Sequence, residues 1–492
     1  MNRAAEKSTV LPSALAGRVD ALLAAGGRMQ MAYAWFPQPD RVQVRYLAST
    51  GAGEPFQLWC CDVLPGQSLP SLATQAPLLG WYEREMQDLY GLRFDGHPEP
   101  WPLVAGGWTE ASPLVDAQGM QACLHAPGHV PEIHGHDVQL LSSGPVRAGV
   151  VESAQHLYFY VGEAVLHYQP RLFFKHRGME RAFEGRDPRG GATLAERVSG
   201  IGSVAHALAY CQAVEDAAGC EVPKRAQQLR AVLAELERLY NHLFYFGHLA
   251  DATTLKVGHA EGVLLSERVK QLNARLTGSR FLRNLIAPGG LRRDIALPHD
   301  FLHTMYLLRK QVDSYLTQLE RTTSYLDRLI TTGVLTREVA FDQGATGPVE
   351  RASGLDRDLR RDHPYAAYAW HAPDVPLAEE GDAYARAKVR AAELRASFQL
   401  LDAFVPTLVD GPIRAECRPE AGAEGLGWAE SPRGSLYYAI HVGADGKLAR
   451  VKIKSPSFSN WRVFPLTVHR TNMMDFAINE ASFGLSTAGC DR

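Results

Sequence analysis

The sequence predicts an α+β fold, in which a small N-terminal α/β domain precedes a large, mainly helical bundle domain that carries β-hairpins. Three apolar runs between residues 29 and 64, separated by turn-forming Pro, Gly and Asp residues, predict the strands of a small sheet. Between residues 224 and 405, apolar residues instead recur at intervals of three and four, as in amphipathic helices. A chain of 492 residues is too long for one core, so we expect two or three domains.

The N-terminal domain is expected to span residues 1–105. Its strands are the segments MQMAYAWF, RVQVRYLAS and PFQLWCCDVL, and the charged segment WYEREMQDLYGLRFDGHPEP predicts a surface helix followed by a loop. Residues 106–142 are rich in Gly, Pro and His and have no clear period, which is typical of a linker. The second domain is then expected to span residues 143–492.

The clearest helix of the second domain is predicted over residues 224–250. Leucines form one apolar stripe along it, while Arg230, Glu237 and Arg238 lie on its other faces. Similar patterns predict further helices over residues 261–278, 301–330 and 383–405, and together these helices imply a bundle. Residues 435–455 change to the alternation of strands around the turn GADGK, which predicts a β-hairpin laid on that bundle.

Composition excludes several classes of protein. Lysine and arginine number 51 against 54 acidic residues, so we expect no nucleic-acid partner. No apolar run approaches the roughly 18–20 residues that cross a bilayer, and the N-terminus lacks the apolar segment of a signal peptide. We therefore expect a cytoplasmic chain that is not itself membrane-spanning. The seven cysteines are scattered without a CxxC pair, so the sequence indicates neither a disulfide framework nor a cluster-binding motif.

Segments along nearly the whole chain carry a resemblance to one superfamily. EREMQDLYGLRFDGHP (residues 83–98) resembles the signature of the C subunit of respiratory complex I. Seven later segments resemble motifs of the complex I D subunit and of the large subunits of NiFe hydrogenases of the hydrogenase-4 and formate hydrogenlyase type. They are GPVRAGVVES, HRGMER, ERVSGIGSVAHALAYCQAVE, ELERLYNHLFYFG, GPVERASGLDRDLRRDHPY, GDAYARAKVRAAELR and GLGWAESPRGSLYYAI. The chain is thus similar to a fused C/D subunit.

The resemblance implies that a metal site has been lost. In the hydrogenases, four thiolates in two CxxC pairs hold nickel and iron, because soft sulfur ligands suit these metals. The corresponding positions in this chain are Ser199, Gly202, Ser486 and Gly489. Since hydroxyl oxygens are hard ligands and glycine has no side chain, we expect no metal, neither nickel nor iron, in this chain. A different metal held by Cys211 and Cys490 is the alternative, although two buried apolar thiols explain these cysteines more simply.

The residues that the resemblance implies for quinone binding are also missing. The D subunit places a tyrosine and a histidine near the quinone headgroup, and this chain has Gly200 in the first segment and Arg147 and Val150 in the second. The sequence ends at Asp491-Arg492, as D subunits do and without the extension of hydrogenase precursors, which fits a protein that receives no nickel. A quinone therefore stays a candidate ligand without its usual anchors.

Three residues are candidates for catalysis or proton relay at the former metal site. By resemblance, Glu152 matches a proton-relaying glutamate and Arg433 matches the arginine above the hydrogenase metal. The alternatives are a turn glutamate held by backbone amides, and an ion pair of Arg433 with Glu430. His206 either faces the cavity or is a hydrogen-bonded core histidine, and we favour the core histidine.

An interior polar network is expected around these candidates. Its members by resemblance are His176, Arg177, Glu180, Glu237, Arg238, His242 and Glu430. The segment CLHAPGHVPEIHGH contains Cys123, His125, His129, His134 and His136, but its spacing matches no familiar zinc motif. Gly-rich segments such as GRDPRGG do not follow a strand and open a helix, so no NAD or ATP site is expected, and any NADH chemistry would belong to another protein of the complex.

We expect, from the resemblance, a subunit of a membrane-associated oxidoreductase complex related to complex I and hydrogenase-4. Its partners would be an iron–sulfur small subunit similar to the complex I B subunit and antiporter-like membrane subunits, which would hold it on the inner face of the cell membrane. It would pass electrons to a quinone-like acceptor or couple redox chemistry to ion pumping. The alternative is a structural scaffold with a vestigial cavity, and a true NiFe hydrogenase is the least favoured function.

Overall fold

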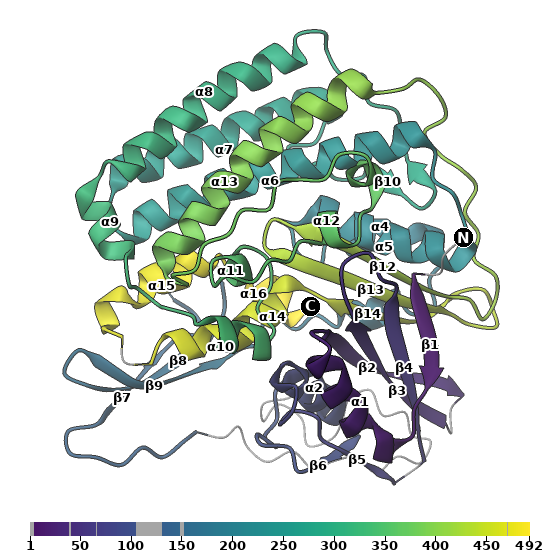
Figure 1. The fold of residues 1–492 in the computed structure, drawn as a ribbon, viewed down its shortest axis with the longest axis vertical. Coiled ribbons are helices and arrows are strands. Elements are labelled where there is room, and N and C mark those ends of the chain that lie inside the picture. The colour runs from purple at the N-terminus through teal and green to yellow at the C-terminus, as the bar shows by residue number, and fades with distance from the viewer. Residues whose placement is uncertain (1–3, 39–40, 65, 105–129, 148–151, 470) are drawn as a thin grey trace.

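A four-stranded sheet with two helices forms the N-terminal part of the chain (Figure 1). The computed structural model describes residues 4–38, 41–64, 66–104, 130–147, 152–469 and 471–492. Strands and helices follow in the order β1 (Ala5–Thr9), α1 (Leu15–Ala24), β2 (Arg28–Gln38), β3 (Arg41–Ser49), β4 (Phe56–Val63), β5 (Ser68–Pro70), α2 (Gly80–Tyr90) and β6 (Arg93–Asp95). The sheet order is β1-β4-β3-β2, with β1 parallel to β4 and the other pairs antiparallel. The three predicted strands are β2, β3 and β4.

The helix predicted in the N-terminal part, α2, is not a surface helix. Glu83 and Asp88 are fully buried and Glu85 is nearly so. Glu85 pairs with Lys452 at 2.6 Å and with Arg492 at 2.7 Å. Both cations come from the C-terminal part of the sequence. These two cations allow Glu85 to be buried, whereas Glu83 accepts hydrogen bonds from Ser71 and the Leu72 amide and Asp88 from the amides of Leu103 and Val104. Helix α2 therefore lies between the two parts of the chain.

The second part begins with strands and continues with long helices. A three-stranded sheet of β7 (Gln139–Ser143), β8 (Gln155–Val161) and β9 (Ala164–Arg171) precedes the helices, although the sequence predicted mainly helices from about residue 144. The helices that follow are α3 (Met179–Phe183), α4 (Ala192–Ala195), α5 (Ser203–Ala218), α6 (Lys224–Ala252) and α7 (Lys256–Thr277). After the short hairpin of β10 (Ile286–Ala287) and β11 (Gly290–Leu291) come α8 (Phe301–Glu320), α9 (Thr323–Leu329), α10 (Arg337–Asp342), α11 (Pro348–Arg351), α12 (Leu359–Asp362) and α13 (Ala383–Phe404).

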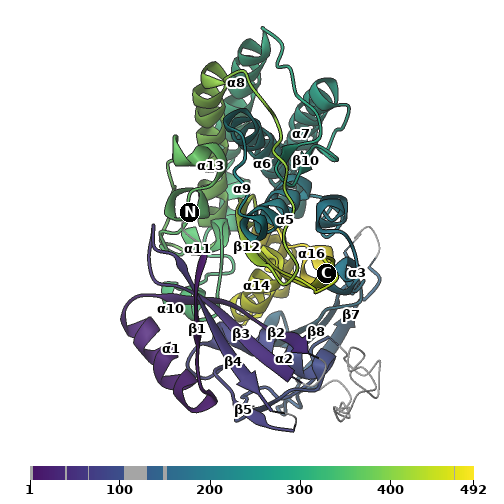
Figure 2. The same cartoon turned by 90° about the vertical axis from the view of Figure 1, so that its right-hand side faces the viewer.

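The long helices α6, α7, α8 and α13 lie side by side and form the bundle (Figures 1 and 2). The prediction over residues 224–250 corresponds to α6, but the helix is buried on nearly every face: Arg230, Glu237 and Arg238 are each at most 2% exposed. Gly262 of α7 allows a close approach to α6, because a Cβ atom there would lie 2.7 Å from the Cα of Gly247. Membrane crossing requires a length and an apolar character that no helix in the described part of the chain combines.

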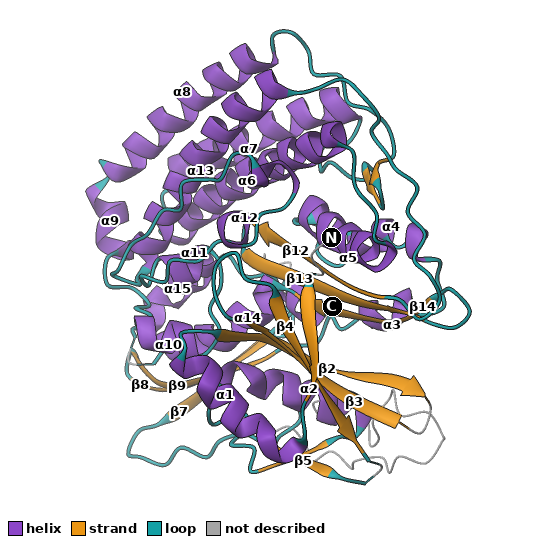
Figure 3. Cartoon of the chain, turned by 45° about the vertical axis from the view of Figure 1, so that its right-hand side comes forward, coloured by secondary structure: helices purple, strands orange, loops and turns teal. Residues whose placement is uncertain are grey.

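A three-stranded antiparallel sheet links the bundle to the N-terminal part (Figure 3). It consists of β12 (Glu424–Ser431), β13 (Gly434–Val442) and β14 (Leu448–Lys454), of which β13 and β14 form the predicted hairpin. Helix α5 packs on β12, and the chain ends with α14 (Pro456–Val463), α15 (Phe476–Phe483) and α16 (Thr487–Asp491). The predicted domain boundaries stay predictions, since residues 105–129 are outside the described ranges.

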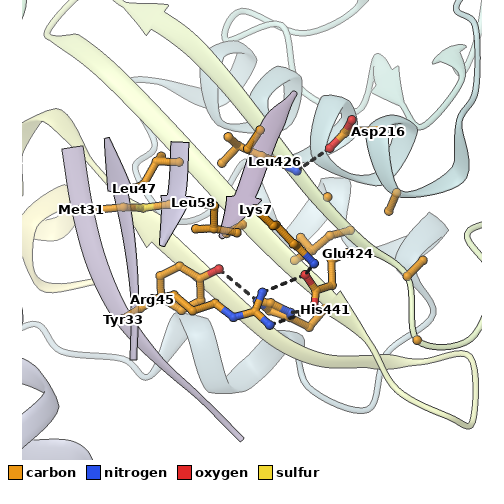
Figure 4. A pocket seen from close by; sticks show the side chains of 17 residues that line it. Lys7, Met31, Tyr33, Arg45, Leu47, Leu58, Asp216, Glu424, Leu426 and His441 are labelled. Carbon is orange, nitrogen blue, oxygen red and sulfur yellow. Dashed lines mark hydrogen bonds and ion pairs between the residues drawn. The ribbon is translucent and has the colours of Figure 1, made fainter. Parts of the chain in front are cut away.

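An ion cluster joins the two parts across a cavity of 350 Å³ (Figure 4). Glu424 of β12 accepts two hydrogen bonds from Arg45 of β3, at 2.8 and 2.9 Å, and pairs with Lys7 of β1. His441 of β13 lies beside them and bonds the hydroxyl of Tyr33 at 3.1 Å. The nearby His441 and the hydrogen bonds from Arg45 keep the pKa of Glu424 well below its usual range despite its burial, so this carboxylate stays charged at the interface.

Candidate functional site

The four positions that correspond to the hydrogenase cysteines lie at the starts of two helices. Ser199 and Gly202 precede α5, and Ser486 is the N-cap of α16, where its Oγ accepts a hydrogen bond from the Gly489 amide at 3.1 Å. A Cβ atom on Gly489 would lie 3.5 Å from the Oγ of Ser199 and 3.5 Å from the Oγ of Ser486. The fold therefore brings three of these positions into contact, and Gly202 lies one helical turn before His206, whose Cδ2 a Cβ on Gly202 would approach to 3.4 Å.

These side chains do not fit a NiFe centre. Two hydroxyls and two glycines provide none of the soft thiolates that such a centre requires. Within the described ranges, no three His, Cys, Asp or Glu side chains lie close enough together to hold a metal ion. Cys211 and Cys490 are fully buried, and burial raises the pKa of both thiols well above the usual value, so neither is a prepared thiolate ligand.

Arg177 holds the two segments of the site together. Its guanidinium donates to the carbonyl of Val198 at 2.7 Å and to the carbonyl of Ala488 at 3.0 Å, one on each side of the contact. Next to it, the Nδ1–H of His176 donates to the carbonyl of Asp491 at 2.7 Å. Both residues therefore position backbone rather than a ligand.

Glu180 belongs to a separate buried ion cluster. It pairs with Arg450 at 2.9 Å and with Lys452 and Arg492 at 3.1 Å each. These three cations outweigh burial and lower the pKa of Glu180 to about 2. The cluster fixes the C-terminal residue next to α16.

Glu152 lies at the first turn of α16, beside Ser486. Its carboxylate accepts hydrogen bonds from the amide of Thr487 at 3.0 Å and from the Thr487 hydroxyl, and the ammonium of Lys175 lies 3.8 Å away. Glu152 thus lies beside the former ligand positions and is held by a backbone amide at the start of a helix, the contact that the second alternative expected. Its role in proton relay stays a prediction.

Arg433 extends from the turn between β12 and β13 toward the same place. Its Nε donates to the carbonyl of Gly484 at 2.5 Å, and its Nη1 lies 3.5 Å from Oδ1 of Asn241. Glu430, the alternative partner of Arg433, pairs instead with Arg351 at 3.2 Å. Burial lowers the pKa of Arg433 to about 10, a shift that the nearby carboxylate of Glu152 opposes, so the guanidinium stays charged at neutral pH.

Glu237 and His206 surround the first turn of α5. The Glu237 carboxylate accepts hydrogen bonds from the amides of Val204 at 2.8 Å and Ala205 at 2.9 Å, two donors that an α-helix leaves without internal partners. Burial raises the pKa of Glu237 to about 7 even against these bonds. The Nδ1 of His206 lies 2.8 Å from the Tyr438 hydroxyl, and burial lowers its pKa to about 3, so this imidazole is neutral at pH 7.

Arg238 and His242 face away from Glu237 and meet a carboxylate that the sequence analysis did not identify. Glu393 of α13 is fully buried and accepts hydrogen bonds from Arg238 at 3.1 Å and from the Nε2–H of His242 at 2.8 Å. It also bonds Arg351. The motif RAAELR contains Glu393, but only its neighbours in space, which come from α6 and α11, distinguish it from an ordinary helix-surface glutamate.

The remaining sequence candidates lie elsewhere or outside the described residues. His134 and His136, from the linker segment, are exposed. Cys123, His125 and His129 lie outside the described ranges, as does Val150. Arg147 pairs with Glu480 of α15 at 3.2 Å.

Comparison with protein families gives three matches in order along the chain. Residues 26–118 match the 30 kDa subunit of respiratory-chain NADH dehydrogenase, and residues 177–260 match nickel-dependent hydrogenase. Residues 263–422 and 417–492 match the 49 kDa subunit of respiratory-chain NADH dehydrogenase.

Individual relatives agree with these matches. Formate hydrogenlyase subunit 5 of Escherichia coli (strain K12) is 32% identical over 415 residues, which cover 80% of this chain and 71% of that protein. The fused C/D subunit of NADH-quinone oxidoreductase from Cereibacter sphaeroides (strain ATCC 17029 / ATH 2.4.9) is 28% identical over 478 residues, covering 86% of this chain and 82% of the relative. A solved archaeal respiratory membrane complex, the membrane-bound sulfane sulfur reductase, contains a chain that is 26% identical with a TM-score of 0.68, and the match covers 72% of this chain and 99% of that one.

Proposed function

Because this chain belongs to the family of fused complex I C/D subunits and hydrogenase-4-type large subunits, we propose that it serves a membrane-associated oxidoreductase complex as a proton-coupled redox subunit without a NiFe centre. Its partners would be an iron–sulfur small subunit, which delivers electrons, and membrane subunits that hold this chain at the inner face of the membrane. In such a complex, electrons would arrive at the segments around Ser199 and Ser486.

The observation that carries this proposal is the composition of the site. Three of the former ligand positions still meet, yet they are Ser199, Ser486 and Gly489. The charged groups around them are present: Glu152 at the start of α16 and Arg433 across from it. Such a site can stabilise a developing negative charge and exchange a proton, but it cannot bind hydride or hydrogen on nickel.

The electron acceptor is the finer part of the proposal. A quinone oxygen is one candidate, because it could accept a hydrogen bond from the Arg433 guanidinium, although the tyrosine and histidine anchors are absent. The structural relative is a sulfane sulfur reductase, so a sulfur compound is the second acceptor to test.

A scaffold function is favoured by one observation. Ser199 and Ser486 are 7% and 2% exposed, and Arg433 bonds protein atoms on the opposite side of the site. The cavities of 350 and 170 Å³ are lined by other residues at the interface of the two parts. Under this alternative, the site would be closed and would only support the complex.

Purification of the membrane complex through a tag on this chain tests both functions. We expect co-purification of an iron–sulfur protein, nickel far below one atom per complex, no hydrogen oxidation, and reduction of a soluble quinone or of polysulfide. Arg433→Met should lower the turnover at least tenfold, with the surface variant Arg189→Met as the matched control. Stoichiometric nickel would refute the proposal, and full activity of Arg433→Met would favour the scaffold.

A further inference from the structure

A second cavity, of 170 Å³, lies where the N-terminal part meets the second part. Residues 49–52, at the end of β3 and just after it, form its outer wall, where Gly51 and Ala52 are exposed, and the buried Arg28 of β2 also lines the cavity. Its inner wall includes Glu430 of β12 and Lys454 of β14, both 4% exposed. The cavity therefore extends from exposed backbone to two buried groups, the carboxyl of Glu430 and the amino group of Lys454.

Glu430 lies among buried charged groups of both signs. The cations are Arg28, Arg238, Arg351, Arg360, Arg390 and Lys454, and the carboxyl groups are Glu235, Glu350, Asp358, Glu393 and Glu430, none more than 4% exposed. The carboxyl group that has the weakest contacts with these cations is the one that burial favours in its neutral form.

Glu430 is the group that takes the proton. Asp358 makes two bonds to Arg360, at 2.7 and 3.0 Å, whereas Glu430 has one guanidinium contact, to Arg351 at 3.2 Å, and a long contact to the Leu359 amide at 3.4 Å. Burial, with the nearby Asp358 carboxylate, accordingly raises the pKa of Glu430 to about 8.

Lys454 provides a second exchangeable proton at the same cavity. Its ammonium donates to the Oγ of Ser435 at 2.9 Å and lies 4.9 Å from the ring centre of Tyr437. Burial, helped by the positive charge of Arg28, lowers the pKa of Lys454 to about 7. Other charged or titratable groups also line this cavity: the ion pair of Arg28 with Glu350, and Asp356, Arg357, Asp358, Arg361, Asp362 and His363. Since the two groups interact, they titrate as a pair near neutral pH.

The β12–β13 hairpin connects this pair with the candidate site. Glu430 and Ser435 are opposite each other in the two strands, and the turn between them presents Arg433 to Gly484 and Asn241. Arg433 lies in the two-residue turn after Ser431, three residues from Glu430 along the chain, so the Cα atoms of the two residues are at most about 10 Å apart. At that distance and an effective dielectric constant of about 20, one negative charge at the site would raise the pKa of a group at the cavity by about one unit.

We propose that this cavity is a proton-loading site, at which Glu430 and Lys454 together take up a proton from cavity water when negative charge reaches the site around Ser199, Ser486 and Arg433. Water supplies the proton, only an O–H or N–H bond forms, and the proton is released when the charge leaves. The inference rests on the proposed function for the source of the charge, which is an electron from an iron–sulfur partner. The protonation of Glu430 itself does not depend on that function.

Infrared spectroscopy of the purified full-length chain tests the protonation directly. At pH 7, the difference spectrum between the wild type and Glu430→Gln should contain the carbonyl band of one protonated carboxylic acid, which shifts promptly in D₂O because the cavity reaches solvent. Glu424→Gln is the matched control and should show no such band, since Glu424 stays ionised. If Glu430→Gln leaves the protonated carboxyl signal unchanged, the inference is overturned.

The pH profile of the intact complex tests the coupling. We expect Lys454→Gln and Glu430→Gln to shift the pH dependence of turnover between pH 7 and 9 by about one unit, while the exposed Lys388→Gln leaves it unchanged. An active complex whose profile is the same in both cavity variants would contradict proton loading and leave the proposed function intact. A complex without any oxidoreductase activity would instead contradict the proposed function, and the infrared result would stand.

Discussion

The contact between Ser199 and Gly489 can be tested by engineering a disulfide. A Cβ atom on Gly489 would lie 3.6 Å from the Cβ of Ser199. Disulfides of normal geometry have Cβ atoms about 3.5–4.5 Å apart, so Ser199→Cys with Gly489→Cys should form the bond without movement of the backbone. Cys490 is replaced by serine in this variant, because it follows Gly489 directly and would compete for the new thiol.

The expected gain in stability follows from the size of the closed loop. A loop of about 290 residues gives an upper limit of about 5–6 kcal/mol in the chain-entropy model, and measured gains mostly fall between about 2 and 4 kcal/mol. We therefore expect the oxidised variant to resist urea more than its reduced form by about 2–4 kcal/mol.

Peptide mapping by mass spectrometry after mild oxidation with diamide identifies the cross-link, and each single-cysteine variant serves as a control. Linked peptides from the two segments should account for most of the protein. If both thiols stay free in the folded chain while they cross-link readily after unfolding, the segments do not meet. The assignment of a shared site would then be wrong.

Three further predictions concern the buried charges and the helix packing. Glu393→Gln removes the carboxylate shared by three buried groups and should lower the free energy of unfolding by about 3 kcal/mol. The exposed Glu380→Gln should lower it by only about 0.5 kcal/mol. Urea titrations measure both values, and equal effects would contradict the network. The folded-state pKa of Glu180, about 2, lies below its ordinary value of 4.5, so its contribution of about 3 kcal/mol is present above pH 4.5 and lost as the pH falls toward 2. Glu180→Gln should flatten this acid limb, and an unchanged limb would refute the assignment. Gly262→Val should destabilise the chain by about 1–3 kcal/mol because α6 occupies the space, whereas Gly17→Val, which has open space around it, should cost about 1 kcal/mol or less.

Periodicity predicted the long helices and the C-terminal hairpin, and it missed the elements whose formation depends on distant partners. Helices α6, α7 and α13 and the hairpin of β13 and β14 follow their apolar patterns. Strand β1 has the sequence AEKST, which has no apolar alternation, and it becomes a strand because its backbone pairs with β4. Helix α2 shows the opposite error. Its charged sequence predicted a surface helix, but Lys452 and Arg492 pair with Glu85 and allow it to be buried.

The sequence by itself determined that the four thiolates are absent, because the residue type at each position fixes which ligand atoms its side chain can offer. It also determined the family, from motifs in order along the chain, and the long helices, from the spacing of their apolar residues. Only the tertiary structure decided that Ser199, Ser486 and Gly489 meet, and that Glu430 lies beside the Asp358 carboxylate whereas Glu180 lies among three cations. A contact and a pKa depend on distances to groups from remote segments, and the fold sets those distances.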